Sequence, residues 1–214
     1  MRFSDRSAAG RALAGRLQHY AGRDDVLVLA LPRGGVPVAL EVARDLQAPL
    51  DVLVARKLAV PGREELVLGA VAEGGETVLS QDLILELGIP QRRVTEAIAR
   101  ERQEVERHER QYRGERPPAA AGGRIAIVVD DGVATGATMR AAALALRRRA
   151  ARRIVAAVPV AAMASCEQFR GEVDELVCVC AVESLHLVGD WYEHFPRLAG
   201  QDVCEILSLA RSPA

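Results

Sequence analysis

Short runs of apolar residues alternate along this chain with segments in which apolar positions recur every three or four residues. Continuous apolar runs are typical of strands buried on both faces of a parallel sheet, and the longer spacing is typical of amphipathic helices. The predicted strands are 26–31, 50–55, 125–129, 153–160 and 175–181. The predicted helices are 4–20, 36–47, 90–112, 136–150, 165–169 and 201–210. This alternation predicts an α/β fold with a doubly wound, mainly parallel five-stranded sheet and right-handed crossovers.

Three segments depart from the alternation. Residues 58–75 carry prolines and glycines among mixed charges, which predicts a long loop, with a hairpin inside it as an alternative. The helix 90–112 has only a thin apolar stripe, so it is either a solvated helix docked along one edge or a contact in a homodimer. Residues 114–123 contain Pro117-Pro118 and three alanines, which indicates a linker.

Composition narrows the class of protein. The 214 residues suit a single domain, 1–214, and 50% of them are hydrophobic, enough for a sizeable core. A net charge of −1 predicts no general attraction to nucleic acid or to an anionic membrane. Residues 1–6 lack the apolar core of a signal peptide, and the four cysteines lack metal-site spacing, so we expect a cytoplasmic protein with reduced thiols.

The most informative feature is the point where the strand 125–129 ends in Asp130 and Asp131. The turn that follows has small side chains, so its amides can approach an anion closely, and the helix after it adds its positive N-terminal end. Paired carboxylates suit a cis-diol or a hydrated cation. The segment therefore predicts a cradle for ribose 5-phosphate. Its phosphate-binding candidates are Val133, Ala134, Thr135, Gly136, Ala137 and Thr138.

Two further loops follow predicted strands and should meet this cradle at the carboxyl edge of the sheet. Pro32-Arg33-Gly34-Gly35 offers unobstructed amides and a fixed cation, or is an ordinary glycine turn. Arg56-Lys57 offers a second pair of cations, or is a solvated strand end.

Residues 128–138 closely resemble the phosphoribosyl pyrophosphate (PRPP) motif of type I phosphoribosyltransferases, namely a hydrophobic strand, Asp-Asp, small residues, Thr-Gly and a final Thr. The Pro-Arg-Gly-Gly loop resembles the pyrophosphate loop of these enzymes, and Arg56-Lys57 matches their basic pair. The resemblance covers most of the chain. It is nearest to a bacterial group of predicted phosphoribosyltransferases that share this loop, an Arg-Lys-x-x-x-Pro-Gly lid and a C-terminal Trp-Tyr/Phe segment.

The resemblance implies an enzyme of nucleotide metabolism. Its reaction would be the Mg²⁺-dependent transfer of 5-phosphoribose from PRPP to a small nitrogen acceptor, a nucleobase above all, with release of pyrophosphate. A PRPP- or nucleotide-sensing regulator without turnover is the alternative. The implied architecture is a core at 22–181, a mobile lid at 58–75 that closes over PRPP, and a hood at 182–214 that binds the acceptor.

The resemblance also implies residue roles. Asp130 and Asp131 would hold the ribose hydroxyls, directly or through water bound to Mg²⁺. The catalytic cations would be Arg33 and Lys57, and the amides of Gly34 and Gly35, with Arg56, would bind the phosphates. Trp191 and Tyr192 would stack on the acceptor, or else form a small core of the hood. Relatives often have a cis peptide bond in the pyrophosphate loop, so we expect one between Pro32 and Arg33.

Overall fold

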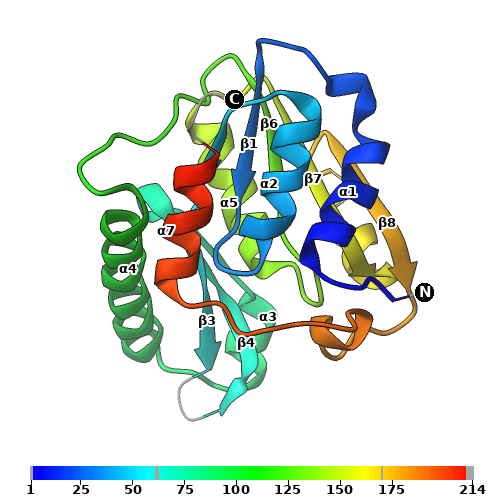
Figure 1. Ribbon diagram of the computed structural model, residues 1–214. Coiled ribbons are helices and arrows are strands. Elements are labelled where there is room, and N and C mark those ends of the chain that lie inside the picture. Colours follow the sequence, from blue (N-terminus) through cyan, green and yellow to red (C-terminus); the bar gives the residue numbers. More distant parts are fainter. Residues whose placement is uncertain (1, 61–62, 170, 211–214) are drawn as a thin grey trace.

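A five-stranded parallel sheet forms the centre of the computed structural model, which describes residues 2–60, 63–169 and 171–210 (Figure 1). The sheet order is β2-β1-β6-β7-β8. The strands are β1 (Val26–Ala30), β2 (Leu50–Val52), β6 (Ile125–Val129), β7 (Arg153–Ala162) and β8 (Glu175–Val182). This confirms the predicted doubly wound architecture. The chain turns outward in opposite directions from β1 and β6, and such a switch point is where α/β sheets bind ligands.

Helices cover both faces of this sheet, as the fully apolar strands require. On one face lie α1 (Arg6–Arg16), α2 (Gly35–Leu46) and α7 (Gly200–Leu209), and on the other lie α5 (Ala137–Arg148) and α6 (Met163–Phe169). In β1, Val26 and Val28 belong to the core under the first group, while Leu27 and Leu29 belong to the core under the second. The predicted helix 4–20 is shorter than expected, because α1 ends at Arg16 and a 3-10 turn, η1 (Gln18–Tyr20), follows it.

The predicted long loop at 58–75 is wrong for most of its length, and the alternative, a hairpin, is confirmed by a pair of antiparallel strands. The segment forms an antiparallel sheet of β3 (Ala55–Val60), β4 (Arg63–Ala72) and β5 (Thr77–Leu79), with the 3-10 turn η2 (Glu73–Gly75) between the last two. Leu58, Leu68 and Val71 are buried beneath it, which gives the strands a core to pack on. Residues 61 and 62 of the predicted lid lie outside the described residues. The predicted strand 50–55 is also divided, because β2 ends at Val52.

The long charged helix α4 (Gln91–Arg113) contacts β3, β4 and α7, so its expected docked edge is present. Before it comes α3 (Gln81–Glu86), which was not predicted. At the end of α4 the buried Arg113 forms ion pairs with Asp51 and Glu73, at 3.0 and 2.8 Å, and so ties the helix to β2 and η2. Within the described ranges, no helix combines the length and apolarity needed to cross a membrane.

Candidate active site

The loops that follow β1 and β6 lie side by side at the carboxyl edge of the sheet, which faces downward in Figure 1. Ala30 is paired with Val129 at the ends of the two strands, and the amide of Leu31 donates to the carbonyl of Val129 over 2.8 Å. The peptide bond between Pro32 and Arg33 is cis, as predicted. We call residues 32–35 the pyrophosphate-type loop, after the resemblance described above. The strand pairing brings this loop against Asp130 and Asp131.

Gly34 and Gly35 allow this contact because side chains would block it. A Cβ atom at Gly34 would overlap the carboxylate of Asp131, and one at Gly35 would meet the carbonyl oxygen of Val129. Gly34 has an ordinary right-handed φ of −63°, so its requirement for glycine is steric and not conformational. The loop therefore packs directly onto the motif, with Asp131 as its neighbour.

The two motif carboxylates occupy different surroundings. Burial, and then the negative charge of Asp131, raise the pKa of Asp130 well above its usual value, while the nearby cation Lys57 acts in the opposite direction. The Oδ1 atom of Asp130 accepts a hydrogen bond of 2.9 Å from the amide of Asp131. Burial also raises the pKa of Asp131, although the neighbouring Arg6 opposes that shift. A positively charged ligand would relieve the repulsion between the two.

Arg6, the first residue of α1, was not identified from the sequence. Its Nε atom lies 2.9 Å from Oδ2 of Asp131, and both side chains are largely buried. Its Nη1 atom donates to the carbonyl of Pro196 over 2.9 Å, and its guanidinium lies 3.6 Å from the ring centroid of Phe195. The sequence holds no signal for this contact, because a charged residue early in a helix is ordinary and its partners are far along the chain.

Residues 133–138, which we call the phosphate-type turn, form hydrogen bonds with β7 and with α6. The amide of Val133 donates to the carbonyl of Val160 at 2.9 Å, which extends the pairing of β6 with β7 into the turn. The hydroxyl of Ser165 on α6 donates to the carbonyl of Ala134. Gly136 precedes α5 with a left-handed φ of +73°, and the ring of Phe169 fills the space where a Cβ atom would lie. Thr135 is exposed and Thr138 is half-buried at the start of α5.

The two predicted basic residues of β3 point to different neighbours. The Nε atom of Arg56 lies 2.6 Å from a carboxylate oxygen of Glu101 on α4, so this cation is already paired. Lys57 is exposed, and its charge acts on Asp130. Arg33 is also exposed, on the loop after β1. Of the three, Lys57 and Arg33 have the freedom to meet an anion above the carboxylates.

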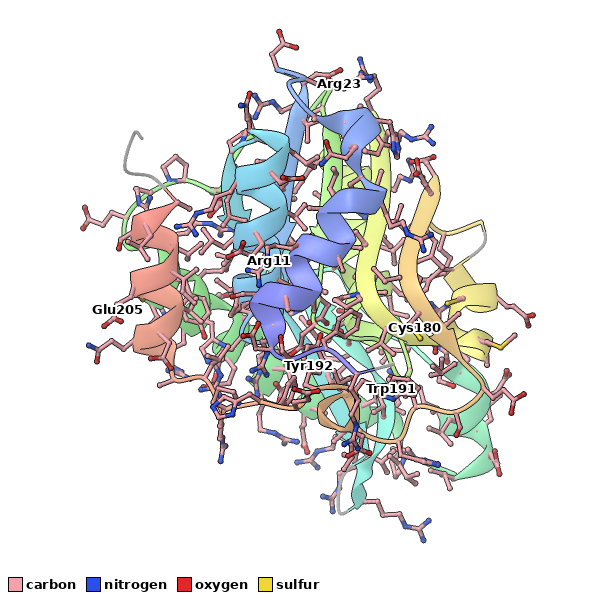
Figure 2. The ribbon with its side chains drawn as sticks, turned by 45° about the vertical axis from the view of Figure 1, so that its right-hand side comes forward. Arg11, Arg23, Cys180, Trp191, Tyr192 and Glu205 are labelled. Atoms are coloured by element: carbon pink, nitrogen blue, oxygen red, sulfur yellow. The ribbon has the colours of Figure 1, made fainter. Side chains whose placement is uncertain are left out.

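The C-terminal segment packs against the start of the chain and crosses this same edge of the sheet (Figure 1). Its 3-10 turn η3 (Val188–Trp191) is followed by Tyr192, which is 4% exposed and whose hydroxyl donates to the carbonyl of Asp131 over 2.5 Å. Figure 2 shows Trp191 and Tyr192 together below the N-terminal end of α1, where both pack against the buried Phe3. Phe195, in contrast, lines a cavity.

One cavity touches Asp131, and a second lies beside the turn that follows the carboxylates. One, of about 330 Å³, is lined by the loop after β1, by Asp131 and by residues 195–198. The other, of about 530 Å³, is lined by Ala134, Thr135 and Ala137 of the turn, by α6 and by the hairpin sheet. Both volumes are within the range of about 300–1,000 Å³ that is usual for small-molecule sites. The phosphate-type turn therefore lines a different cavity from residues 195–198.

The chemistry of the carboxylate pair suits a magnesium ion that has further ligands from outside the chain. Among the residues that the structure describes, no three His, Cys, Asp or Glu side chains gather to hold a metal by themselves. Mg²⁺ is usually bound by one or two carboxylates together with waters and substrate phosphates. Each carboxylate has one oxygen engaged, Oδ2 of Asp131 by Arg6 and Oδ1 of Asp130 by the amide of Asp131, so each would offer its other oxygen to the ion.

Comparison with known proteins identifies the family of the chain. The family model of the phosphoribosyl transferase domain matches residues 5–183. The chain belongs to the phosphoribosyl transferase family. It is 42% identical over 208 residues to two Mycobacterium tuberculosis proteins, from strains CDC 1551 and H37Rv, each named "Putative phosphoribosyl transferase". That alignment covers 97% of this chain but only 47% of each relative, so the chain spans about half of their length.

A solved structure of another protein matches this chain over nearly its whole length. The crystal structure of the protein TT1426 from Thermus thermophilus is 42% identical, with a TM-score of 0.81. The match covers 97% of this chain and 98% of the other. The five-stranded sheet, the flanking helices and the hairpin sheet are thus placed within one family architecture.

Proposed function

We propose that this protein transfers 5-phosphoribose from PRPP to a small nitrogen acceptor in the cytoplasm and releases pyrophosphate. One observation carries the proposal. A glycine loop of the pyrophosphate type packs on two carboxylates, beside a turn whose amides and helix N-terminus suit a phosphate. These are the groups that the two ends and the sugar of PRPP require.

The proposed roles follow from position. Amides of residues 133–138 and the hydroxyl of Thr135 would bind the 5-phosphate, and Asp130 would bind the ribose hydroxyls. Arg33, Lys57 and the amides of Gly34 and Gly35 would bind the leaving pyrophosphate. Mg²⁺, when bound, would neutralise the leaving group as a Lewis acid. Since positive charge builds on the sugar as its C1–O bond breaks, buried carboxylates beside it would stabilise the transition state electrostatically.

The test has two stages. PRPP with Mg²⁺ should raise the melting temperature in proportion to the logarithm of its concentration, by mass action. The double variant Asp130→Asn/Asp131→Asn should lose this shift, whereas Asp82→Asn on the exposed face of α3 should keep it. Release of pyrophosphate should then be measured with a panel of purines, pyrimidines and small amines.

The outcomes separate the proposal from its rival. Binding of PRPP with acceptor-dependent release of pyrophosphate supports transfer. Binding that stays intact in the double variant contradicts the role of the carboxylates. Binding without turnover across the panel would favour a PRPP-sensing regulator.

A further inference from the structure

The cavity of about 330 Å³ beside the motif is the place where an acceptor can reach the ribose, if the proposed function is correct. It touches Gly34 of the pyrophosphate-type loop and the carboxylate of Asp131, so it opens onto the point where C1 of the ribose would lie. It contains no residue of the phosphate-type turn, which lines the larger cavity instead. Its apolar wall is Phe195, Pro196 and Leu198, which suits a flat ring.

The charged groups of this cavity are unbalanced. Three arginines, Arg6, Arg33 and Arg197, line it together with one carboxylate, Asp131. Arg6 and Asp131 neutralise each other at 2.9 Å. No ion pair between described side chains involves Arg33 or Arg197, and both residues are exposed where they line the cavity. A neutral ring would leave both charges without a partner.

Arg33 and Arg197 belong to different walls of the cavity. Arg33 is on the loop that would hold pyrophosphate, so the leaving group would account for its charge. Arg197 comes from the C-terminal segment and follows the apolar residues 195 and 196 directly. Arg6 and Tyr192 already pack on the ring of Phe195, so an acceptor would lie against the exposed edge of this ring and against Pro196 and Leu198, beside Arg197. Guanidinium groups bind carboxylates in a bidentate manner, which orients a planar acid as well as attracting it.

The cavity also lacks a base that could activate a neutral acceptor. Among the described residues that line it, the only carboxylate has an oxygen committed to Arg6, and none is a histidine. An acceptor whose ring nitrogen carries a lone pair needs no such base, and the proton of an N–H ring would pass to the departing pyrophosphate or to water. Its nitrogen lone pair would form the bond to C1 of the ribose, while the C1–O bond breaks and its electrons leave with pyrophosphate.

We infer that the acceptor of this protein is a planar nitrogen heterocycle that binds as an anion, with its acidic group against Arg197. The inference rests on the proposed function, and it predicts a preference between matched acids and neutral rings. Suitable probe pairs are orotate with uracil, and nicotinate with nicotinamide. Each pair keeps one ring system and differs in the charged group.

The experiment measures binding of these probes by calorimetry to the full chain, with ribose 5-phosphate, pyrophosphate and Mg²⁺ present as unreactive occupants of the donor site. At least one acid should bind about tenfold or more tightly than its neutral partner, as expected for a charge-assisted hydrogen bond. Arg197→Gln should remove this preference, and Arg197→Lys should keep part of it. Arg92→Gln, an exposed change on α4, is the control and should leave the preference unchanged.

The results are distinguishable. A preference for acids that disappears in Arg197→Gln supports the inference. Equal binding of acids and neutral rings, a preference that survives Arg197→Gln, or no binding of any acid while the donor-site occupants bind, overturns it and leaves the proposed donor intact. Failure of the donor-site occupants and of PRPP to bind overturns the proposed function, and the inference with it.

Discussion

Replacing Asp130 with asparagine should stabilise the ligand-free protein while it removes PRPP binding. Burial and the charge of Asp131 raise the pKa of Asp130, so its ionised form is disfavoured in the folded state. Asparagine has nearly the same shape and keeps an oxygen that can accept the 2.9 Å hydrogen bond from the amide of Asp131. The substitution therefore removes the unfavourable charge and keeps the local structure.

The size of the gain follows from linkage. Each unit by which folding raises this pKa corresponds to about 1.4 kcal/mol of unfolding free energy lost at neutral pH. Asp130→Asn should therefore raise the melting temperature, since about 1 kcal/mol of unfolding free energy shifts it by roughly 2–4 °C in a chain of this length. The unfolded carboxyl loses its proton near about pH 3.9 and the folded one at higher pH. The gain should therefore be full above the folded pKa and shrink as the pH falls toward about 4.

The assay is thermal unfolding at several pH values, with and without PRPP and Mg²⁺. Asp174→Asn is the matched control, because Arg147 and the amide of Ile154 hold the pKa of Asp174 below its usual value. The same change there should lower the melting temperature. A lower melting temperature for Asp130→Asn at neutral pH, or an undiminished PRPP shift, would refute the reasoning about this carboxyl.

Three further sets of substitutions test neighbouring contacts. Gly34→Ala should destabilise the protein by about 1–3 kcal/mol in urea unfolding and abolish the PRPP shift, because its Cβ would overlap a motif carboxylate. Gly15→Ala is the control, because no atom lies within 4 Å of its added Cβ, and it should stabilise α1 by roughly 0.5–1 kcal/mol. Equal effects at the two glycines would contradict the close contact of Gly34 with Asp131. Thr135→Val should weaken ribose 5-phosphate binding in a direct titration. Gly136→Ala should weaken it more, because the φ of Gly136 is +73° and an aromatic ring occupies the place of the added Cβ. Unchanged affinity in both variants would argue against the turn as the phosphate site. Arg6→Gln should lower the free energy of unfolding by about 3–5 kcal/mol, since it leaves a buried carboxylate without its partner, and wild-type stability would contradict that pairing.

The central sheet and the motif could be predicted because their signals are local. Strands buried on both faces must be apolar throughout, so β1 and β6 are visible as runs of valine, leucine and isoleucine. The turn after β6 is visible because its amides require small neighbours. The order of elements then fixes which loops meet, since parallel strands all present their carboxyl ends to one edge.

The hairpin of β3 and β4 was predicted only as an alternative to a long loop, and β5 was not predicted, because the contacts that stabilise this sheet are not local. Within β4, Gly69 resembles a loop residue in the sequence. In the structure it is a strand residue whose missing side chain allows the carbonyl of Val78 on β5 to approach. Glycine inside a strand often marks such a close backbone approach, but the sequence alone cannot distinguish it from a turn.

Arg6 shows the limit of sequence reasoning most clearly, because its importance comes entirely from contacts 125 and 190 residues away. A single guanidinium neutralises Asp131, holds the carbonyl of Pro196 and covers the ring of Phe195. The two ends of the chain therefore join at the motif itself. A ribose hydroxyl that competes for Asp131 would loosen the same side chain that positions the wall of the acceptor cavity. We therefore expect binding of the donor at Asp131 to change the shape of that cavity. A lid and a hood that act independently would not produce such a coupling.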